Sequence, residues 1–127
     1  MTPSMHRRVR DYFVESGLTT GFTTQMLKWR DTGKLDVQFI VFRPNGGSSI
    51  RNDLGSEYYV LVDVIGAVNE DEAADNAVQA IIAHVQANPN PNDCIGYIEN
   101  LGSIPSPVTT TEGRLVYRLQ FAIKYGD

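Results

Sequence analysis

Cysteine is almost missing from this chain, since Cys94 is the single one among 127 residues. A lone cysteine cannot form an internal disulfide, and it excludes a zinc site built from several thiolates. This scarcity fits a reducing compartment such as a cytoplasm. We interpret Cys94 itself as a small core residue.

An excess of basic charge and long apolar runs are missing too. The net charge is -4, so the chain lacks the positive excess that drives contact with nucleic acid or anionic lipid. No run approaches the roughly 20 apolar residues that span a bilayer, and the N-terminus lacks the apolar core of a signal peptide. We therefore expect a soluble, unprocessed protein with no membrane association and no nucleic-acid sequence recognition.

The remaining composition is that of one ordinary domain. With 127 residues, of which 42% are hydrophobic and 20% charged, the chain can bury a core without disulfides or metal. We expect a single domain over residues 1–127.

The clearest pattern in the sequence is an alternation near the C-terminus. Between residues 114 and 125, large apolar side chains occupy every second position, and mostly polar ones lie between them. A period of two is that of a pleated strand, so the pattern predicts a long terminal strand with one aromatic-rich face on the core. Burial of each large side chain contributes about 1.5 to 3 kcal/mol, and we expect loss of this strand to unfold the domain. The apolar positions are Leu115, Tyr117, Leu119, Phe121, Ile123 and Tyr125.

An N-terminal helix is predicted between Ser4, which can cap it, and Gly17, which can stop it. Its apolar residues recur at three- and four-residue spacing and make the helix amphipathic. Its basic residues form either a contact patch for an acidic partner or a solvated face, and the solvated face is the commoner case. The apolar set is Met5, Val9, Tyr12 and Phe13, and the basic set is His6, Arg7, Arg8 and Arg10.

A second helix is predicted after Asn69, because Asn69 and Glu72 have the spacing of a capping box. Acidic residues at positions 70 to 72 suit the positive end of the helix dipole. An apolar stripe continues to a stop at Asn88 and Pro89, and we expect it to cover the sheet. The stripe consists of Ala74, Val78, Ile81, Ile82 and Val85.

Two further strands are expected to pair as an antiparallel hairpin well inside the sheet. Residues 36–43 place apolar side chains on both faces, positions 37, 39 and 41 on one and 40 and 42 on the other, and Pro44 should end this strand. Residues 58–65 are apolar on both faces except at Asp63. Residues 44–56 between them are glycine-rich and polar and predict a long, mobile loop. Residues 19–33 fit a strand or a helical turn, and we favour extended structure.

The second half of the chain adds irregular segments. Ile95 to Ile98 indicates a short edge strand interrupted by Gly96, and residues 102–113 predict a second long loop. The elements together indicate an α+β fold, a mostly antiparallel sheet with two helices packed on it.

No set of residues has the spacing of a catalytic or ligand-binding motif. Cys94 and His84 are a conceivable dyad, but nothing marks Cys94 as an activated thiolate. Gly46 and Gly47 lack the lysine and the helix start of a phosphate loop. Acidic residues at positions 70, 71, 72 and 75 could gather a divalent cation, yet helix capping already explains them. We expect no catalytic residue, no cofactor and no metal.

Two segments, within this order of elements, point to a family. They are the acidic helix start after residues 64–68 and the ending Leu119-Gln120-Phe121-Ala122-Ile123-Lys124-Tyr125. With them, the chain resembles over nearly its whole length the tail terminator proteins of long-tailed bacteriophages, the minor tail protein U type. The resemblance implies an α+β subunit of a hexameric ring that ends the tail tube and joins it to the head connector, without catalysis. It also implies tail tube and head-tail connector proteins as partners, assembly in the host cytoplasm and a place in the virion tail.

In such a ring, two different patches of each subunit meet. We expect arginines of one patch to pair with carboxylates of the other, and the two long loops to contact partners. Two other functions stay open: a small ligand-binding or regulatory module with its ligand between sheet and loops, and a hydrolase that uses Cys94 and His84. The candidate interface residues are Arg43, Arg51, Arg114 and Arg118, facing Asp53, Glu57, Glu70 and Asp71.

Overall fold

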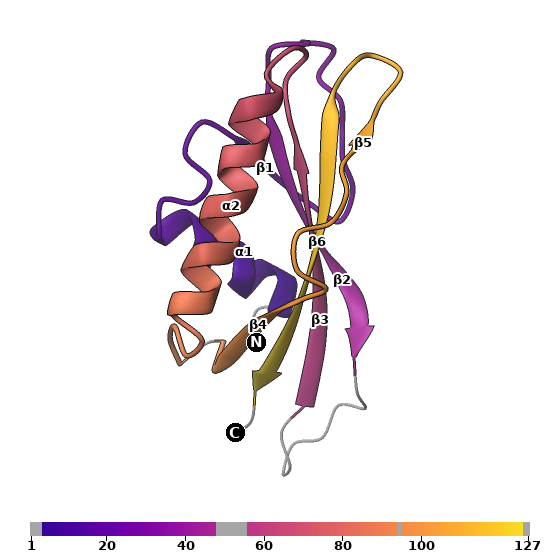
Figure 1. Cartoon of the computed structure of the whole chain (residues 1–127). Coiled ribbons are helices and arrows are strands. Elements are labelled where there is room, and N and C mark those ends of the chain that lie inside the picture. The colour runs from indigo at the N-terminus through magenta and orange to yellow at the C-terminus, as the bar shows by residue number, and fades with distance from the viewer. Residues whose placement is uncertain (1–3, 48–55, 94, 126–127) are drawn as a thin grey trace.

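A computed structural model of the chain describes residues 4–47, 56–93 and 95–125. The described part folds as a sheet with both helices on one of its sides, as Figure 1 shows. The α+β class and the mostly antiparallel sheet predicted from the sequence are confirmed. The elements are α1 (Met5–Glu15), β1 (Thr23–Met26), β2 (Phe39–Gly47), β3 (Ser56–Ile65), α2 (Asp71–Ala87), β4 (Tyr97–Leu101), β5 (Val108–Thr109) and β6 (Leu115–Tyr125).

The strands run in the order β1-β2-β3-β6-β4, and β5 also pairs with β6. β1 is parallel to β2, and the other pairs are antiparallel. The predicted hairpin of β2 and β3 is confirmed, and both strands have neighbours on each side. β4 is an edge strand, also as predicted. The terminal strand β6 lies between β3 and β4, so the last residues of the chain hold the sheet together.

The inner face of the sheet, which faces the helices, carries the main core. The alternation in β6 is confirmed, because Tyr117, Leu119, Phe121 and Ile123 are at most 5% exposed and belong to this core. Phe13 of α1 packs edge-on against two rings of the sheet, Phe42 at 5.6 Å and Phe121 at 5.8 Å between ring centroids. Such edge-to-face contacts add to burial and fix the position of the helix.

The first helix ends as its sequence predicts. Gly17 adopts φ +76°, its N–H donates to the carbonyl of Val14, and the N–H of Leu18 donates to the carbonyl of Phe13. This pair of hydrogen bonds is the Schellman motif, which a glycine at this position permits. The four predicted apolar residues are the buried ones. Ser4 stands at the N-cap but makes no side-chain capping hydrogen bond, so that part of the prediction is wrong.

For the second helix, the predicted apolar stripe is confirmed and the predicted capping residue is wrong. The five predicted stripe residues are the buried residues of α2. The N-cap is Glu70, without a side-chain capping bond, whereas Asn69 has φ +65°. Asn69 lies in a turn closed by the N–H of Glu70 and the carbonyl of Ala67, 3.2 Å apart. A left-handed residue inside that turn does not have the extended backbone of a capping residue.

Pro44 does not end β2, which continues to Gly47. The last pair between β1 and β2 is Met26 with Phe42, so Pro44 stands where β2 has only β3 as a neighbour, just before a register shift. Proline is tolerated at such edges and bulges because no second neighbour needs its missing N–H. The predicted loop 44–56 is therefore too long at both ends, and residues 48–55 lie outside the described part.

Three smaller predictions need correction as well. Within residues 19–33 only β1 is a strand, and turns surround it. Gly96 precedes β4 rather than interrupting a strand. The predicted loop 102–113 contains β5, which pairs with the start of β6.

Candidate interaction surface on the helix-free face

The outer face of the sheet, which points away from the helices, is closed over one half. Trp29 and Val37 pack there on a small second core of Phe39, Val41 and Ile65. The rings of Trp29 and Phe39 meet edge-on with 5.9 Å between their centroids. The segment between β1 and β2 thus covers this end of the outer face and removes it from contact with partners.

Arg114 lies at the closed half and is fully buried. Its guanidinium donates to three backbone carbonyls, Lys34 at 2.6 Å, Val37 at 2.7 Å and Gly66 at 3.1 Å. The same group lies over the rings of Trp29 and Phe39, 5.7 and 5.5 Å from their centroids. A buried guanidinium needs hydrogen-bond acceptors, and these three carbonyls accept from its Nη1 and Nη2. Arg114 therefore joins three separate segments of the fold.

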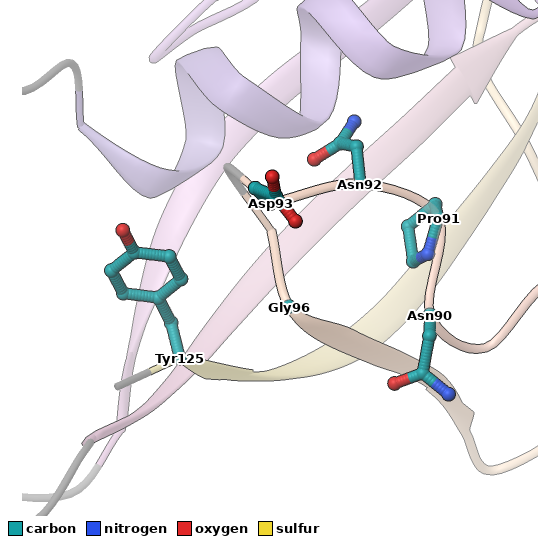
Figure 2. Close-up of a pocket in the computed structure, with 6 residues that line it drawn as sticks. All are labelled: Asn90, Pro91, Asn92, Asp93, Gly96 and Tyr125. Carbon is teal, nitrogen blue, oxygen red and sulfur yellow. The ribbon is translucent and has the colours of Figure 1, made fainter. Parts of the chain in front are cut away.

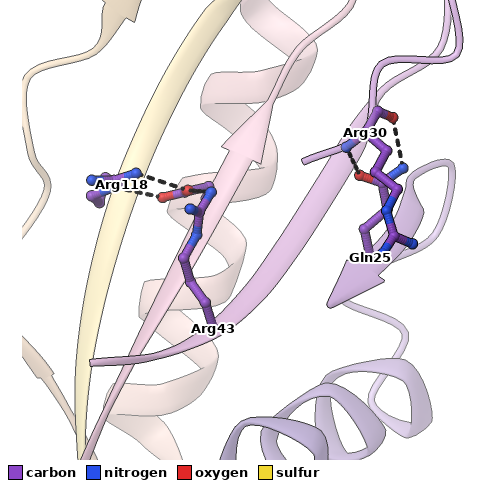
Figure 3. Close-up of polar contacts among 5 residues, drawn as sticks. Gln25, Arg30, Arg43 and Arg118 are labelled. Carbon is purple, nitrogen blue, oxygen red and sulfur yellow. Dashed lines mark hydrogen bonds and ion pairs between the residues drawn. The ribbon is translucent and has the colours of Figure 1, made fainter. Parts of the chain in front are cut away.

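The other half of the outer face is open and contains a buried carboxylate. Asp63, on β3, is 2% exposed although no helix covers it. Arg118, on β6, donates to it from Nε at 2.9 Å and from Nη2 at 3.2 Å, and Nη2 of Arg43, on β2, donates to Oδ2 of the same carboxylate. Figure 3 shows the guanidinium groups of Arg43 and Arg118 meeting at this point from β2 and β6, the two strands on either side of β3. Asp63 and Arg118 are direct cross-strand partners.

This cluster carries one more positive charge than negative. Asp63, through its hydrogen bond and its charge, raises the pKa of Arg118 above the ordinary value, so the arginine stays charged. The Arg118 side chain is 55% exposed and that of Arg43 is 26% exposed. The carboxylate is thus enclosed, while the positive groups reach the surface.

The open half of the outer face also contains half-buried apolar side chains. Gln120 of β6 lies between Leu61 of β3 and Leu101 of β4 in the register. Both leucines are partly exposed and Gln120 is exposed. Side chains of mixed character, with charge beside apolar area, are typical of contact surfaces between proteins. We call the following six residues the arginine patch: Arg43, Leu61, Asp63, Leu101, Arg118 and Gln120.

The two edge strands, β1 and β4, are short, and polar contacts lie beside both of them. Beside β1, the Gln25 side chain makes two hydrogen bonds with the backbone of Arg30, at 2.9 and 2.8 Å, as Figure 3 shows. Beside β4, the N–H of Ile98 donates to the carbonyl of Pro89 at 2.8 Å. Short edge strands offer few backbone groups to a foreign strand.

The structure divides the predicted interface residues. It brings Arg43 and Arg118 together, through Asp63, and it places Glu70 and Asp71 on the surface at the start of α2. Glu57 is partly exposed on the outer face opposite Lys124. Arg114 is enclosed by its own chain, and Arg51 and Asp53 lie outside the described residues. Sequence reasoning missed the role of Asp63, although its position as the one charged residue of the predicted strand 58–65 was the available signal.

A surface hollow of about 640 Å³ lies beside the end of β6. Figure 2 shows its lining, in which the turn before β4 faces the ring of Tyr125. Oδ1 of Asn92 accepts the N–H of Ile95 at 2.9 Å, so this side chain holds the turn. Gly96 has φ +80°, and a Cβ there would lie 2.7 Å from the carbonyl oxygen of Lys124. Close backbone packing therefore explains the glycine without a ligand.

The residues weighed for chemistry lie apart from the arginine patch. The ring of His84 is 5.6 Å from that of Tyr12, and Cys94 lies outside the described residues. Asp75 accepts the hydroxyl of Tyr117 at 3.1 Å. Within residues 4–47, 56–93 and 95–125, no three His, Cys, Asp or Glu side chains gather as a metal site would require. No helix in that part is both long and apolar enough to cross a membrane.

Comparison with known proteins gives one family and one fold. A family model described as phage tail termination protein matches residues 2–127. A solved structure aligns with 96% of this chain and 98% of its own, with a TM-score of 0.53 and 11% sequence identity. At that identity the alignment shows a shared fold alone. No curated protein matches the sequence.

Proposed function

The chain belongs to the phage tail termination protein family, and we propose that it acts as a ring of six subunits that ends the tail tube and joins it to the head connector. The match over residues 2–127 carries this proposal. The protein is a component of phage tails, and its role is one of assembly rather than of bond chemistry. Its partners in this role are the tail tube protein, the connector protein and further copies of itself.

The two-layer architecture supports a ring. Closed rings of more than two subunits need two different surfaces that fit each other, one on each side of the subunit. The helix layer and the open half of the sheet are such surfaces, because they lie on opposite sides of the domain (Figure 1). Rotation of one subunit onto the next can then repeat the same contact around an axis.

Candidate pairs across this contact follow from charge. Arg43 and Arg118 would lie on one side, and Glu70 and Asp71 on the other. Glu57 lies on the same outer face as the two arginines, so in this contact it would stand on their side. Arg51 and Asp53 stay predictions for the same contact, since they lie outside the described residues. Arg114 is assigned to the fold instead, because its donors are engaged inside the chain.

Assembly would take place in the bacterial cytoplasm, and the ring would remain in the virion tail of a functional phage. The test uses purified tail tubes mixed with the chain carrying a gold or fluorescent label. We expect the label at one end of each tube and not along its length. Label on the tube wall, or on no tube at all, would contradict a terminating role.

A matched control keeps the experiment specific. Tubes already capped by an excess of unlabelled chain should acquire no label at their ends. If label still binds there, the signal is adsorption to the tube and not occupation of a defined end site.

A further inference from the structure

We propose that the arginine patch of one subunit binds the acidic start of α2 in the next copy of the chain. The contact is thus sheet face to helix, not strand edge to strand edge. This inference rests on the proposed function, since it names the surfaces through which the ring would close. Its two components are the patch defined above and the residues Glu70, Asp71 and Glu72.

The sheet edges are the first alternative, and their geometry disfavours it. Continuous sheets between subunits need a free row of N–H and C=O groups on each edge strand. β1 has four residues and is followed by the Gln25–Arg30 pair, while the β4 edge already donates from Ile98 to Pro89. At β4 an incoming strand would have to displace the hydrogen bond of Ile98, and beside β1 it would meet the segment that the Gln25 side chain holds.

The open half of the outer face has an unusual charge arrangement for a solvated surface. Asp63 is 2% exposed on the face away from the helices, and it holds two arginines that both reach the surface. The Nε of Arg43 is buried and has no hydrogen-bond partner among the described residues. A carboxylate that arrives from outside would meet guanidinium groups that are already fixed in position, so little side-chain entropy would be lost.

The start of α2 supplies matching carboxylates. Glu70, Asp71 and Glu72 are consecutive and all exposed. α2 contains no lysine or arginine along its 17 residues, so the helix itself does not neutralise them. A net positive patch and three adjacent carboxylates on the opposite layer are complementary, and such complementarity selects the register of a contact.

At the arginines, an effect on assembly has to be compared with an effect on stability, because a change at either position also removes a partner of Asp63. Gln120 is the better test position, since it is exposed, lies beside Arg118 on the same face and takes no part in the Asp63 cluster. We expect Gln120→Glu to raise the concentration at which subunits assemble about fivefold, and Gln120→Lys to lower it by a similar factor. Analytical ultracentrifugation over a concentration series measures both, with urea unfolding as a check that the fold is equally stable.

The partner side is tested by compensation. Glu72→Lys alone should weaken assembly, and Glu72→Lys combined with Gln120→Glu should restore it. Arg7→Glu, an exposed charge reversal on α1, is the matched control and should leave assembly unchanged. Each single change weakens assembly and the two together restore it, and a general effect of net charge cannot produce that pattern.

The outcomes distinguish a failure of this inference from a failure of the proposed function. Rings that form equally well with glutamate, glutamine or lysine at position 120 would overturn the sheet-to-helix contact and leave the terminator role intact. A wild-type chain that stays monomeric at every concentration and on tube ends would overturn both.

Discussion

Arg114, directly before β6, and Arg118, within it, stand four residues apart on the outer side of the sheet, yet they have opposite roles. Arg114 is 0% exposed and donates to three backbone carbonyls from distant segments. The Arg118 side chain is 55% exposed and shares one carboxylate with Arg43. The difference comes from what lies above each residue, the Trp29 segment over the first and open surface over the second. Whether an arginine on this side of the sheet supports the fold or can contact a partner thus depends on whether another segment covers it. The pattern of the sequence does not show this.

The largest expected effect comes from replacing Arg114, the buried one of the two arginines. We expect Arg114→Met to lower the free energy of unfolding by about 3 kcal/mol or more, because three carbonyls lose a charged donor and remain buried. Arg114→Lys should recover little of the loss, since an ammonium group cannot reproduce the planar fork. Urea unfolding followed by circular dichroism measures both variants. A loss below about 1 kcal/mol in Arg114→Met would show that water replaces the guanidinium without cost.

The carboxylate beneath Arg118 should give the next largest effect. In Asp63→Asn the two guanidinium groups keep their positions but lose the charge between them, and an amide N–H₂ faces them. We expect a loss of about 2 kcal/mol, within the range for hydrogen bonds to charged groups. Unfolding in low salt should show a larger loss than unfolding in high salt, because salt screens the repulsion that remains. An equal loss at both salt concentrations would contradict this reason.

Removing the exposed arginine should affect stability least and assembly most. Arg118→Gln removes one partner of the buried Asp63 but leaves Arg43 on it, so we expect about 1 kcal/mol of lost stability, less than in Asp63→Asn. The same variant should assemble at clearly higher concentration than the wild type. Stability is read from urea unfolding and assembly from sedimentation. A variant that folds poorly but assembles normally would place Arg118 with Arg114 as a structural residue.

A change of pH serves as a contrast to these arginine changes, because it acts on a histidine of α1. The pH effect should include His6, whose pKa is lowered from 6.5 by burial first and by Arg7 and Arg10 next. The folded state therefore favours the neutral ring, and its stabilising contribution is present above pH 6.5 and is lost as pH falls through the lowered pKa. Urea midpoints at pH 7.5 and 5.5 should differ less in His6→Gln than in the wild type. Equal differences would remove His6 as a cause.

The sequence was sufficient to predict features that depend on one helix or one strand alone. Period-two alternation identified the core face of β6, and helical spacing identified the buried residues of both helices. These patterns depend on one face being buried, whatever covers it. Gly17 was likewise identified because its left-handed backbone is needed by the helix end alone.

Contacts between distant segments could not be read in the same way. Nothing near Arg114 in the sequence indicates that carbonyls of Lys34 and Gly66 will surround it. Pro44 was taken as a strand end because the sequence does not show that β1 stops opposite Phe42. Asn69 and Glu72 had the right spacing for a capping box, but the turn before the helix gave Asn69 φ +65°. In each case tertiary packing, and not local propensity, determined the outcome.

The central claim is that this chain closes into a ring through two unlike surfaces. The most direct measurement is the native mass of the purified wild-type chain over a wide concentration range, with particles imaged at the highest concentration. We predict a sixfold ring that dissociates on dilution and in high salt. A fixed monomer or dimer at every concentration, which also fails to join the end of added tail tubes, would contradict the claim.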